Sequence, residues 1–339
     1  MSEYLGRIGR MEVSWPWGNA GGVIKTYEEL EAMVSTAVGW AEVGSFTIEK
    51  RYGNKKDPET GELKIDPETS KPLVDYYHDP VTGESGNSLG MPNPGRDELV
   101  GQIPEMNRLA ATYKKEVVYN VAPVSDDPVT ETQELVHSFA SAGARRVLVN
   151  GGCPNVEVPG GDDEARHELL SRDADMTYLT LHGLQAVTDR YPDLDIYYRL
   201  SPQETFSQAG RVYTNILRAG TVRAVWTPNT WPGYKPMKDG KPALTIKGNI
   251  GGRSGPAVAE EAMEQVVWAL TSLRGSGIDV VASSGIANSE ALQLRAAKQL
   301  KRVLDLGAVA GAGTTFYYEI EHGWKDDTDR MLTELGSVI

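Results

Sequence analysis

Short runs of β-branched and aromatic residues alternate along the chain with longer segments of helical periodicity. This alternation is typical of strands and helices that build a parallel sheet. Eight strands are expected, at Glu12–Ser14, Ser45–Ile48, Val117–Val121, Arg146–Asn150, Ile196–Leu200, Ala224–Thr227, Asp279–Ala282 and Ala308–Gly311. The expected helices are Tyr27–Trp40, Asp97–Tyr113, Glu131–Ala142, Asp175–Arg190, Phe206–Arg218, Ala257–Arg274, Ser289–Leu306 and Asp326–Leu335. The pattern predicts the α/β class and one (β/α)8 TIM barrel domain over residues 1–339.

Two connections are too long to be plain loops. Residues 49–96, after the second expected strand, contain three Asp-Pro turn signals, at Asp57, Asp66 and Asp79. Their irregular spacing predicts successive surface turns and not a structural repeat. Residues 229–253, after the sixth strand, are rich in Gly, Pro and Lys. Long insertions after barrel strands lie at the C-terminal face and often build an active site there.

Charge and composition exclude several function classes. Of 339 residues, 34 are Lys or Arg and 47 are Asp or Glu, which gives a net charge of −13. This acidic balance disfavours nucleic acid and anionic membranes as partners. No long uncharged apolar run and no signal-peptide pattern are found, so we expect a cytoplasmic location. A single cysteine permits no internal disulfide and no thiolate metal cluster.

Polar and Gly-rich clusters follow the expected strands. Ser283–Gly285 follows the seventh strand and Gly311–Thr315 ends the eighth. Small turns at these two strands are where barrels commonly hold a ligand phosphate, although Gly in a single turn has a purely structural explanation. The pair favours a phosphate site, for flavin mononucleotide (FMN), pyridoxal phosphate or a sugar phosphate. The spacing alone does not choose among these ligands.

Two further residue types carry candidate chemistry at the same face. Cys153 lies in a Gly-Gly-Cys-Pro-Asn turn, where a thiolate would serve as general base or nucleophile. Four asparagines also follow strands, and each taken alone is typical of a turn. Together their amides would suit a small ring of alternating N–H and C=O groups. They are Asn87, Asn150, Asn155 and Asn229. The histidines show no ligand spacing, so we assign no metal.

Several segments resemble the dihydroorotate dehydrogenase family. Asn87–Asn93 is similar to that family's Asn-Ser-Met-Gly-Leu-Pro-Asn signature, and Asn150–Asn155 to its Asn-Leu-Ser-Cys-Pro-Asn loop. Other similar segments are Thr47–Asn54, Gly251–Gly255 and Gly313-Thr314. The similarity runs in order over nearly the whole chain.

The resemblance implies a homodimeric FMN enzyme of pyrimidine biosynthesis that oxidises dihydroorotate to orotate. It places Cys153 at the catalytic-base position, as in the soluble class 1 enzymes. The implied substrate-binding residues are Asn87, Leu89, Gly90, Met91, Asn150, Asn155, Asn229 and Thr230. The implied cofactor-binding residues are Ala20, Gly21, Arg199, Gly252, Ser284, Gly285, Gly313 and Thr314. The electron acceptor stays open, and a partner subunit for electron transfer is one option.

Two departures from the family pattern bear on the substrate. Arg199 stands where the family has Lys, which keeps the charge but replaces a point charge by a planar fork. Gly44 aligns with a second active-site Lys of the family, and Lys50, the nearest alternative, belongs to another matched position. A first alternative is therefore a divergent flavin oxidoreductase acting on another dihydropyrimidine-like ring or a cyclic enone or amide. A second is a barrel that binds a ligand without catalysis.

Overall fold

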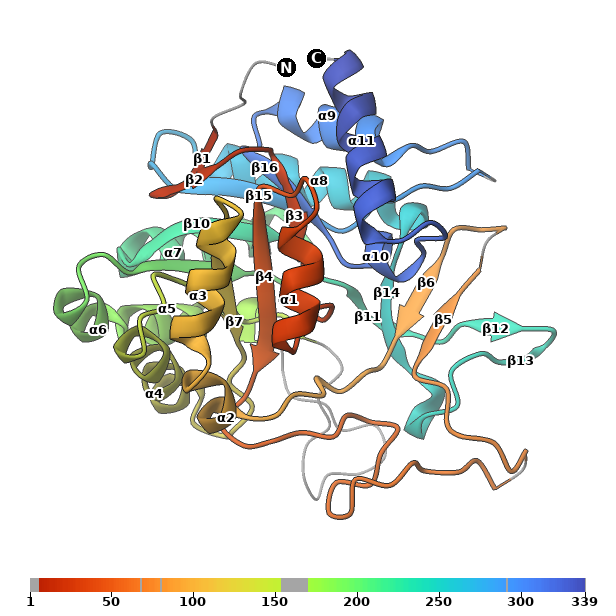
Figure 1. The fold of residues 1–339 in the computed structure, drawn as a ribbon. Helices are drawn as coiled ribbons and strands as arrows, with labels where there is room; N and C mark the ends of the chain where they lie inside the picture. The colour runs from red at the N-terminus through yellow and green to blue at the C-terminus, as the bar shows by residue number, and fades with distance from the viewer. Residues whose placement is uncertain (1–5, 68, 80, 154–169, 291, 339) are drawn as a thin grey trace.

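A computed structural model of the protein describes residues 6–67, 69–79, 81–153, 170–290 and 292–338. Within these residues, eight parallel strands close into a barrel, in the order β10-β15-β16-β3-β4-β7-β8-β9 (Figure 1). The barrel strands are β3 Trp17–Asn19, β4 Trp40–Phe46, β7 Glu116–Val121, β8 Arg146–Asn150, β9 Asp195–Arg199, β10 Val222–Thr227, β15 Asp279–Ser283 and β16 Ala310–Gly313. The predicted TIM barrel is confirmed.

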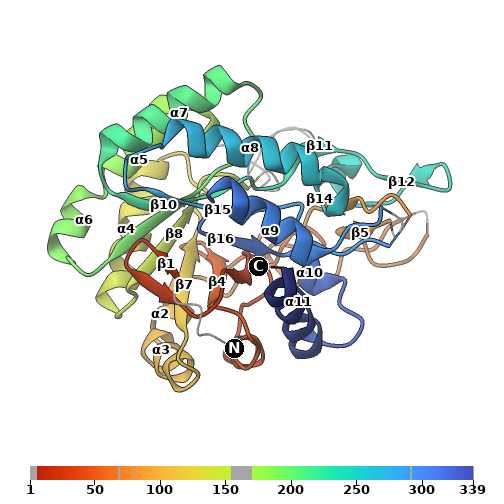
Figure 2. The same ribbon diagram turned by 90° about the horizontal axis from the view of Figure 1, so that it is seen from above.

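Helices surround the barrel strands (Figure 2). They are α1 Tyr27–Val34, α2 Arg96–Val100, α3 Ile103–Thr112, α4 Pro128–Ser141, α5 Ala174–His182, α6 Gln185–Arg190, α7 Phe206–Ala219, α8 Ala259–Ser272, α9 Ala296–Leu306, α10 Thr315–Tyr318 and α11 Trp324–Val338. Short 3₁₀ helices cover Leu170–Arg172, Lys247–Asn249 and Pro256–Val258. A capping box starts α1, because the Thr26 hydroxyl accepts from Glu29 N and the Glu29 carboxylate accepts from Thr26 N.

The positions predicted for the first two barrel strands are wrong. Glu12–Ser14 overlaps β2 (Met11–Val13), which pairs with β1 (Gly6–Ile8) in a hairpin outside the barrel. The second strand is Trp40–Phe46, not Ser45–Ile48, so the expected helix Tyr27–Trp40 ends six residues earlier, at Val34. Two expected helices are each broken in two, and Ser289–Leu306 becomes helical only at Ala296.

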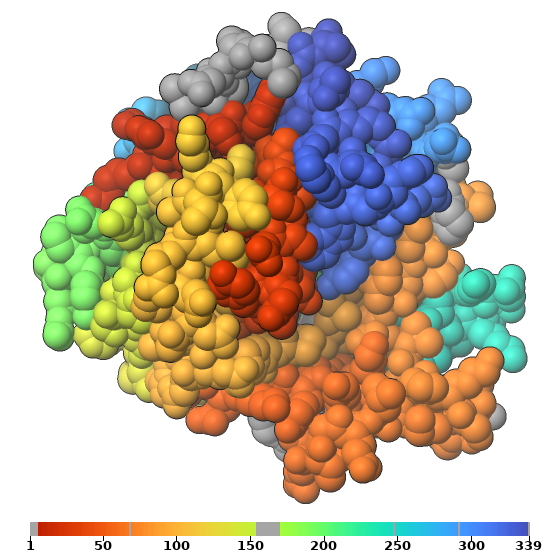
Figure 3. All heavy atoms as spheres, in the orientation of Figure 1, coloured from red at the N-terminus to blue at the C-terminus, as the bar shows by residue number. Residues whose placement is uncertain are grey.

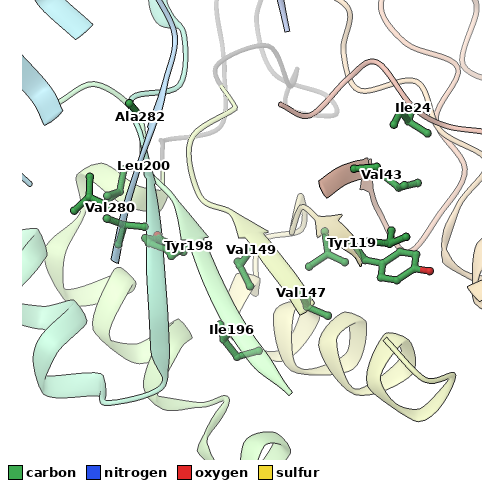
Figure 4. Close-up of a cluster of buried hydrophobic side chains, with 14 of the residues drawn as sticks. Ile24, Val43, Tyr119, Val147, Val149, Ile196, Tyr198, Leu200, Val280 and Ala282 are labelled. Atoms are coloured by element: carbon green, nitrogen blue, oxygen red, sulfur yellow. The ribbon is translucent and has the colours of Figure 1, made fainter. Parts of the chain in front are cut away.

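The core has an outer and an inner layer. The outer layer fills the space between strands and helices, and Figure 4 shows Val147 and Val149 of β8 beside Ile196 of β9. The inner layer fills the barrel interior with Trp40 and Trp226, whose ring centroids lie 6.4 Å apart. The barrel is therefore a packed core rather than a channel, as is usual for this fold.

The β1–β2 hairpin closes the N-terminal end of the barrel. Ile8, Met11 and Val13 are buried in the inner layer. At the hairpin turn, Gly9 N donates to Asp279 Oδ2 at 2.7 Å, and Arg10 Nε donates to Asp195 Oδ1 at 2.6 Å. Asp195 and Asp279 begin β9 and β15, so these contacts fix the hairpin to the strand starts.

The two long insertions meet in one small sheet at the opposite end. Its order is β11-β14-β6-β5, with β5 Tyr76–His78 and β6 Ser85–Asn87 from the first insertion. The second insertion supplies β11 Trp231–Tyr234 and β14 Gly251–Ser254, together with the separate hairpin β12 Met237–Lys238 and β13 Lys241–Pro242. Figure 3 shows the two insertions, in orange and teal, side by side.

The Asp-Pro signals form the expected surface turns. Asp57, Asp66 and Asp79 each accept, through the backbone carbonyl, the N–H of the residue four positions later: Gly61, Ser70 and Gly83. Each Asp Oδ1 also accepts a backbone N–H inside its turn, as Asp57 does from Glu59 and Thr60. The described residues contain no helix that is long and apolar enough to cross a membrane.

Candidate active site

A pocket opens at the C-terminal ends of the barrel strands, beneath the small sheet. Its empty volume is about 930 Å³, part of which is open solvent. The pocket is lined by Ala20, Gly21, Gly22, Lys25, Ser45, Tyr76, Asn87, Leu89, Gly90, Met91, Asn150, Cys153, Arg199, Pro228, Asn229, Thr230, Ser254, Ser283, Ser284, Thr314, Thr315 and Tyr318.

A chain of amide hydrogen bonds crosses the pocket. Asn150, the last residue of β8, donates from Nδ2 to Ser45 Oγ at 2.9 Å. Its Oδ1 accepts from Asn229 Nδ2 at 3.2 Å and from Gly152 N at 3.2 Å. The thiol-bearing Cys153 follows Gly152 directly and is partly buried. Three strand ends, those of β4, β8 and β10, are thus joined beside the thiol.

Asn87 enters from the small sheet rather than from the barrel. It is the last residue of β6 and lies opposite Tyr76 of β5 on one side and Gly252 of β14 on the other. Its Nδ2 donates to Gly252 O at 3.5 Å. The lining residues Leu89, Gly90 and Met91 follow it directly. The first insertion therefore forms the wall of the pocket.

A buried ion pair supports the pocket from within the barrel. The Arg199 guanidinium binds both oxygens of Glu42, with Nη1–Oε1 at 2.7 Å and Nη2–Oε2 at 2.6 Å. Asn120 Nδ2 donates to the same Oε1 at 2.6 Å. Glu42 is fully buried and Arg199 is 4% exposed. Bidentate pairing orients the guanidinium and offsets its charge, so the cation that faces the pocket carries its own counterion.

Small residues lie at the end of the pocket formed by β3, β15 and β16. Gly21 packs so closely on the ion pair that a Cβ there would lie 2.7 Å from Glu42 Oε1 and 2.9 Å from Arg199 Nη1. Thr314 Oγ1 donates to Gly21 O at 2.9 Å. The Ser284 hydroxyl is buried and has no hydrogen-bond partner among the described residues. A ligand oxygen placed there would satisfy it.

Lys25 also reaches the pocket, from the loop between β3 and α1. Its Nζ donates to Ser45 O at 3.1 Å and lies 5.6 Å from the centroid of the Phe46 ring. Burial lowers the pKa of Lys25 to about 7, against the opposing effects of Glu42, Cys153 and Glu29, which favour the ammonium. A lysine that titrates near neutral pH inside a pocket is a candidate functional group.

Comparison with known proteins identifies the family. Residues 7–295, most of the chain, match the family described as dihydroorotate dehydrogenase. This chain belongs to the dihydroorotate dehydrogenase family. It is accordingly a dihydroorotate dehydrogenase-type oxidoreductase.

The solved structures agree on the fold. A crystal structure of the dihydroorotate dehydrogenase of Eimeria tenella in complex with ferulenol is similar, with a TM-score of 0.69 and 16% sequence identity. The similarity covers 98% of this chain and 85% of that one. At this identity it shows the shared barrel alone. No curated protein matches the chain.

The structure brings most of the family-implied residues into the pocket. Of the substrate-binding set, only Asn155 lies outside the described residues. Of the cofactor-binding set, Gly252, Gly285 and Gly313 do not line the pocket but adjoin it: Gly252 pairs with Asn87, Gly285 follows Ser284, and Gly313 precedes Thr314. Lys50 is not a lining residue, and its Nζ lies 4.5 Å from the Tyr52 ring centroid.

Four residues of the candidate site in this dihydroorotate dehydrogenase family member were not predicted from the sequence: Glu42, Lys25, Tyr76 and Tyr318. Glu42 lies in an expected helix-to-strand linker, and only the folded barrel brings it to Arg199. Tyr76 and Tyr318 line the pocket with ring centroids 5.2 Å apart, although they are far apart in the sequence. The local sequence of these residues carries no signal for a site.

Proposed function

We propose that the protein is an FMN-dependent enzyme that oxidises dihydroorotate to orotate, with Cys153 as the general base. The observation that carries this proposal is the convergence of the Cys153 turn, the amides of Asn87, Asn150 and Asn229, and the small-residue end of one pocket. The family assignment supports the reaction class. Class 1 character, a homodimer, a cytoplasmic location and a place in pyrimidine biosynthesis belong to the same proposal.

The pocket residues fit FMN. Phosphate needs hydrogen-bond donors at a place that the backbone approaches closely, and the partnerless Ser284 hydroxyl beside Thr314 meets that need. The residues that would hold the cofactor are Ala20, Gly21, Arg199, Gly252, Ser284, Gly285, Gly313 and Thr314. When bound, FMN supplies the acceptor for the hydride that leaves substrate carbon 6.

The side chains of the pocket would orient the substrate and move one proton. Amides of Asn87, Asn150 and Asn229 match the alternating donors and acceptors of the dihydropyrimidine ring. Fixing the ring in one orientation lowers the entropic cost of the reaction. The Cys153 thiolate would take the proton from carbon 5 as the hydride leaves carbon 6, so that a carbon–carbon double bond forms. Arg199 would lie on the side of the pocket where the reaction occurs, and Glu42 would offset its positive charge.

One observation favours a second candidate, a flavin oxidoreductase with a related ring as substrate. Gly44 has φ +129°, and a Cβ there would lie 2.3 Å from Asn120 O. The backbone therefore leaves no room for the lysine that the family has at this position. The resemblance implies that this lysine contacts flavin and substrate, so its loss favours a different ring as substrate.

Anaerobic titration of the purified protein with dihydroorotate separates these candidates. The proposal expects protein with bound FMN whose visible absorption bleaches with one equivalent of dihydroorotate and returns on adding fumarate, NAD or a quinone. Bound flavin that dihydroorotate leaves oxidised would favour the related-ring substrate. Protein that neither contains nor takes up FMN would overturn both and leave the non-catalytic barrel.

A further inference from the structure

Position 44 carries no charged side chain, but the neighbouring loop between β3 and α1 carries Lys25, which lines the pocket. The loop between β3 and α1 is attached to the Gly44 backbone by two hydrogen bonds. Gly22 N donates to Gly44 O at 2.7 Å, and Gly44 N donates to Ile24 O at 3.0 Å. Ile24 also forms a parallel bridge with Val43. Lys25 therefore begins beside Gly44, on a backbone that this contact fixes.

The side chain of Lys25 extends from there along β4. Its Nζ reaches the carbonyl of Ser45, one residue beyond Gly44, and forms no ion pair with a carboxylate of the described residues. The backbone N–H of Lys25 donates to Glu29 Oε2 at 2.6 Å, so the capping box of α1 also positions the residue. The arrangement holds the Lys25 ammonium against β4, one residue beyond Gly44.

The Ser45 residue connects this ammonium to the thiol. Its carbonyl accepts from Lys25 and its hydroxyl accepts from Asn150, which in turn accepts from Gly152 N, next to Cys153. Besides Cys153, the charged groups that act on Lys25 are Glu42 of β4 and Glu29 of α1. The other charged or titratable residues that line the pocket are Arg199 of β9, Tyr76 and Tyr318. Because Arg199 is already held by Glu42, it offers the thiol little additional positive charge.

We propose that Lys25 is a positioning residue for Cys153, and that its ammonium stabilises the thiolate that acts as base. A cation near a thiol favours the thiolate and lowers the thiol pKa. The inference rests on the proposed function for the role of the thiol, but the pairing itself is a property of the protein alone. It also explains how the pocket can lack the family's lysine at position 44, because Lys25, on the loop between β3 and α1, supplies a positive charge instead.

Cys153 is the only cysteine of the chain, so its alkylation can be followed on the intact protein. The pH dependence of alkylation by iodoacetamide is measured by mass spectrometry on the wild type and on Lys25→Met, as purified and at equal FMN content. We expect the thiol of Lys25→Met to react about tenfold more slowly below pH 7, where wild-type Lys25 is protonated. At higher pH the two profiles should converge as Lys25 loses its proton. Lys25→Arg keeps a cation and should retain most of the wild-type profile.

Lys115→Met is the matched control. Lys115 is also a partly buried lysine bonded to a serine, with Nζ donating to Ser14 Oγ at 2.9 Å, but it does not line the pocket. Its removal should leave the alkylation profile unchanged. If Lys25→Met does not fold, Lys25→Gln removes the charge while keeping a polar group. An unchanged alkylation rate below pH 7 in a folded, uncharged variant at position 25 overturns the proposal.

The two proposals fail in different ways. Slower acid-side alkylation of Lys25→Met, in a protein that dihydroorotate does not reduce, would sustain the Lys25–Cys153 pair and count against the proposed substrate. Reduction by dihydroorotate with an unchanged acid-side alkylation rate would sustain the proposed function and overturn the role of Lys25. In the active enzyme, Lys25→Met should lower the reaction rate mainly below pH 7, whereas a merely structural role would lower the rate at every pH.

Discussion

The two ends of the barrel hold buried charge in different ways. At the N-terminal end, Asp195 is fully buried, and its oxygens accept from Arg10 Nε at 2.6 Å and from Arg10 N at 2.8 Å. Arg146 adds a second guanidinium, with Nε 3.7 Å from Asp195 Oδ2. The hairpin covers this group of charges. The buried Arg146 Nε has no hydrogen-bond partner among the described residues, but the charge of Asp195 lies close to it.

At the C-terminal end, the polar groups are left partly unsatisfied. The Lys25 ammonium has a carbonyl as its partner, and the buried Ser284 hydroxyl has none among the described residues. Unsatisfied buried groups cost stability, and folds retain them where a ligand or a reaction uses them. The buried charges at one end thus hold the hairpin to the barrel, whereas under the proposed function the polar groups at the other end serve what binds there.

The largest expected effect is on catalysis and comes from the thiol. Cys153→Ala should slow the reduction of bound flavin by dihydroorotate by about 10²–10⁴-fold, the usual range for loss of a general base. The melting temperature should stay close to that of the wild type, because the side chain is small and partly exposed. Stopped-flow absorbance measures the rate, and Cys153→Ser is the isosteric comparison. Full-rate reduction in Cys153→Ala would rule out this residue as the base.

The second effect is on stability, at the other end of the barrel. Asp195→Asn leaves Arg10 and Arg146 without their carboxylate and should cost about 3 kcal/mol of unfolding free energy, measured by denaturant titration. The rate of the folded variant should be unchanged. Asp193→Asn, two residues away and exposed, should change the unfolding free energy by less than about 0.5 kcal/mol. Equal costs for the two variants would contradict the comparison.

The third expected effect is a gain in the free energy of unfolding rather than a loss. Because burial lowers the pKa of Lys25 from 10.5 to about 7, the unfolded chain binds more protons than the native state between these values. Native Lys25 therefore destabilises the fold below pH 7, and the penalty disappears as the pH approaches 10.5. Lys25→Met should gain on the order of 2 kcal/mol at neutral pH, a value reduced for the partial exposure of the side chain.

The measurement is the unfolding free energy of Lys25→Met and of the wild type across this pH range. The gain should be greatest at low pH and should shrink as the pH rises. A variant that is less stable than the wild type at neutral pH would show that Lys25 contributes to the fold rather than burdening it.

The smallest effect concerns the small sheet. The His78 ring lies 2.8 Å from Glu319 Oε1, and this hydrogen bond raises the pKa of His78. The stabilisation is therefore present below the ordinary pKa of 6.5 and is lost as the pH rises through the higher native value. His78→Gln should lose at most about 1 kcal/mol, and only in acid, because the pair is partly exposed. Melting temperatures across the pH range would test this, and a loss that persists in alkali would point to packing instead.

The barrel could be predicted because most of its strands are β-branched runs buried on both faces. Val117–Val121 and Arg146–Asn150 are examples where the predicted and observed strands nearly coincide. The first two strands could not be predicted this way. β3 consists only of Trp-Gly-Asn. β4 contains Glu42 and Gly44, which are unusual in a buried strand. Glu42 is accommodated there by its ion pair with Arg199, and Gly44 by its close packing against Asn120.

The residues of the candidate site, like the barrel strands, include some that could be predicted from the sequence and some that could not. Residues in continuous motifs, such as Asn87 and Cys153, could be found because the motif itself carries the resemblance. Lys25 could not, since its role depends on a loop that folds back onto Gly44. Which lysine serves a pocket is decided by the backbone that carries it, and an aligned position does not reveal that.

The small sheet has a consequence for how such enzymes diverge. Asn87 in one insertion lies opposite Gly252 in the other, and successive side chains of a strand point to opposite faces. A one-residue slip of β6 against β14 would turn the Asn87 side chain to the opposite face of the small sheet, away from the pocket. We therefore expect the two insertions to change together when such enzymes diverge. Replacing one insertion by that of a relative should disrupt ligand recognition, whereas replacing both should transfer it.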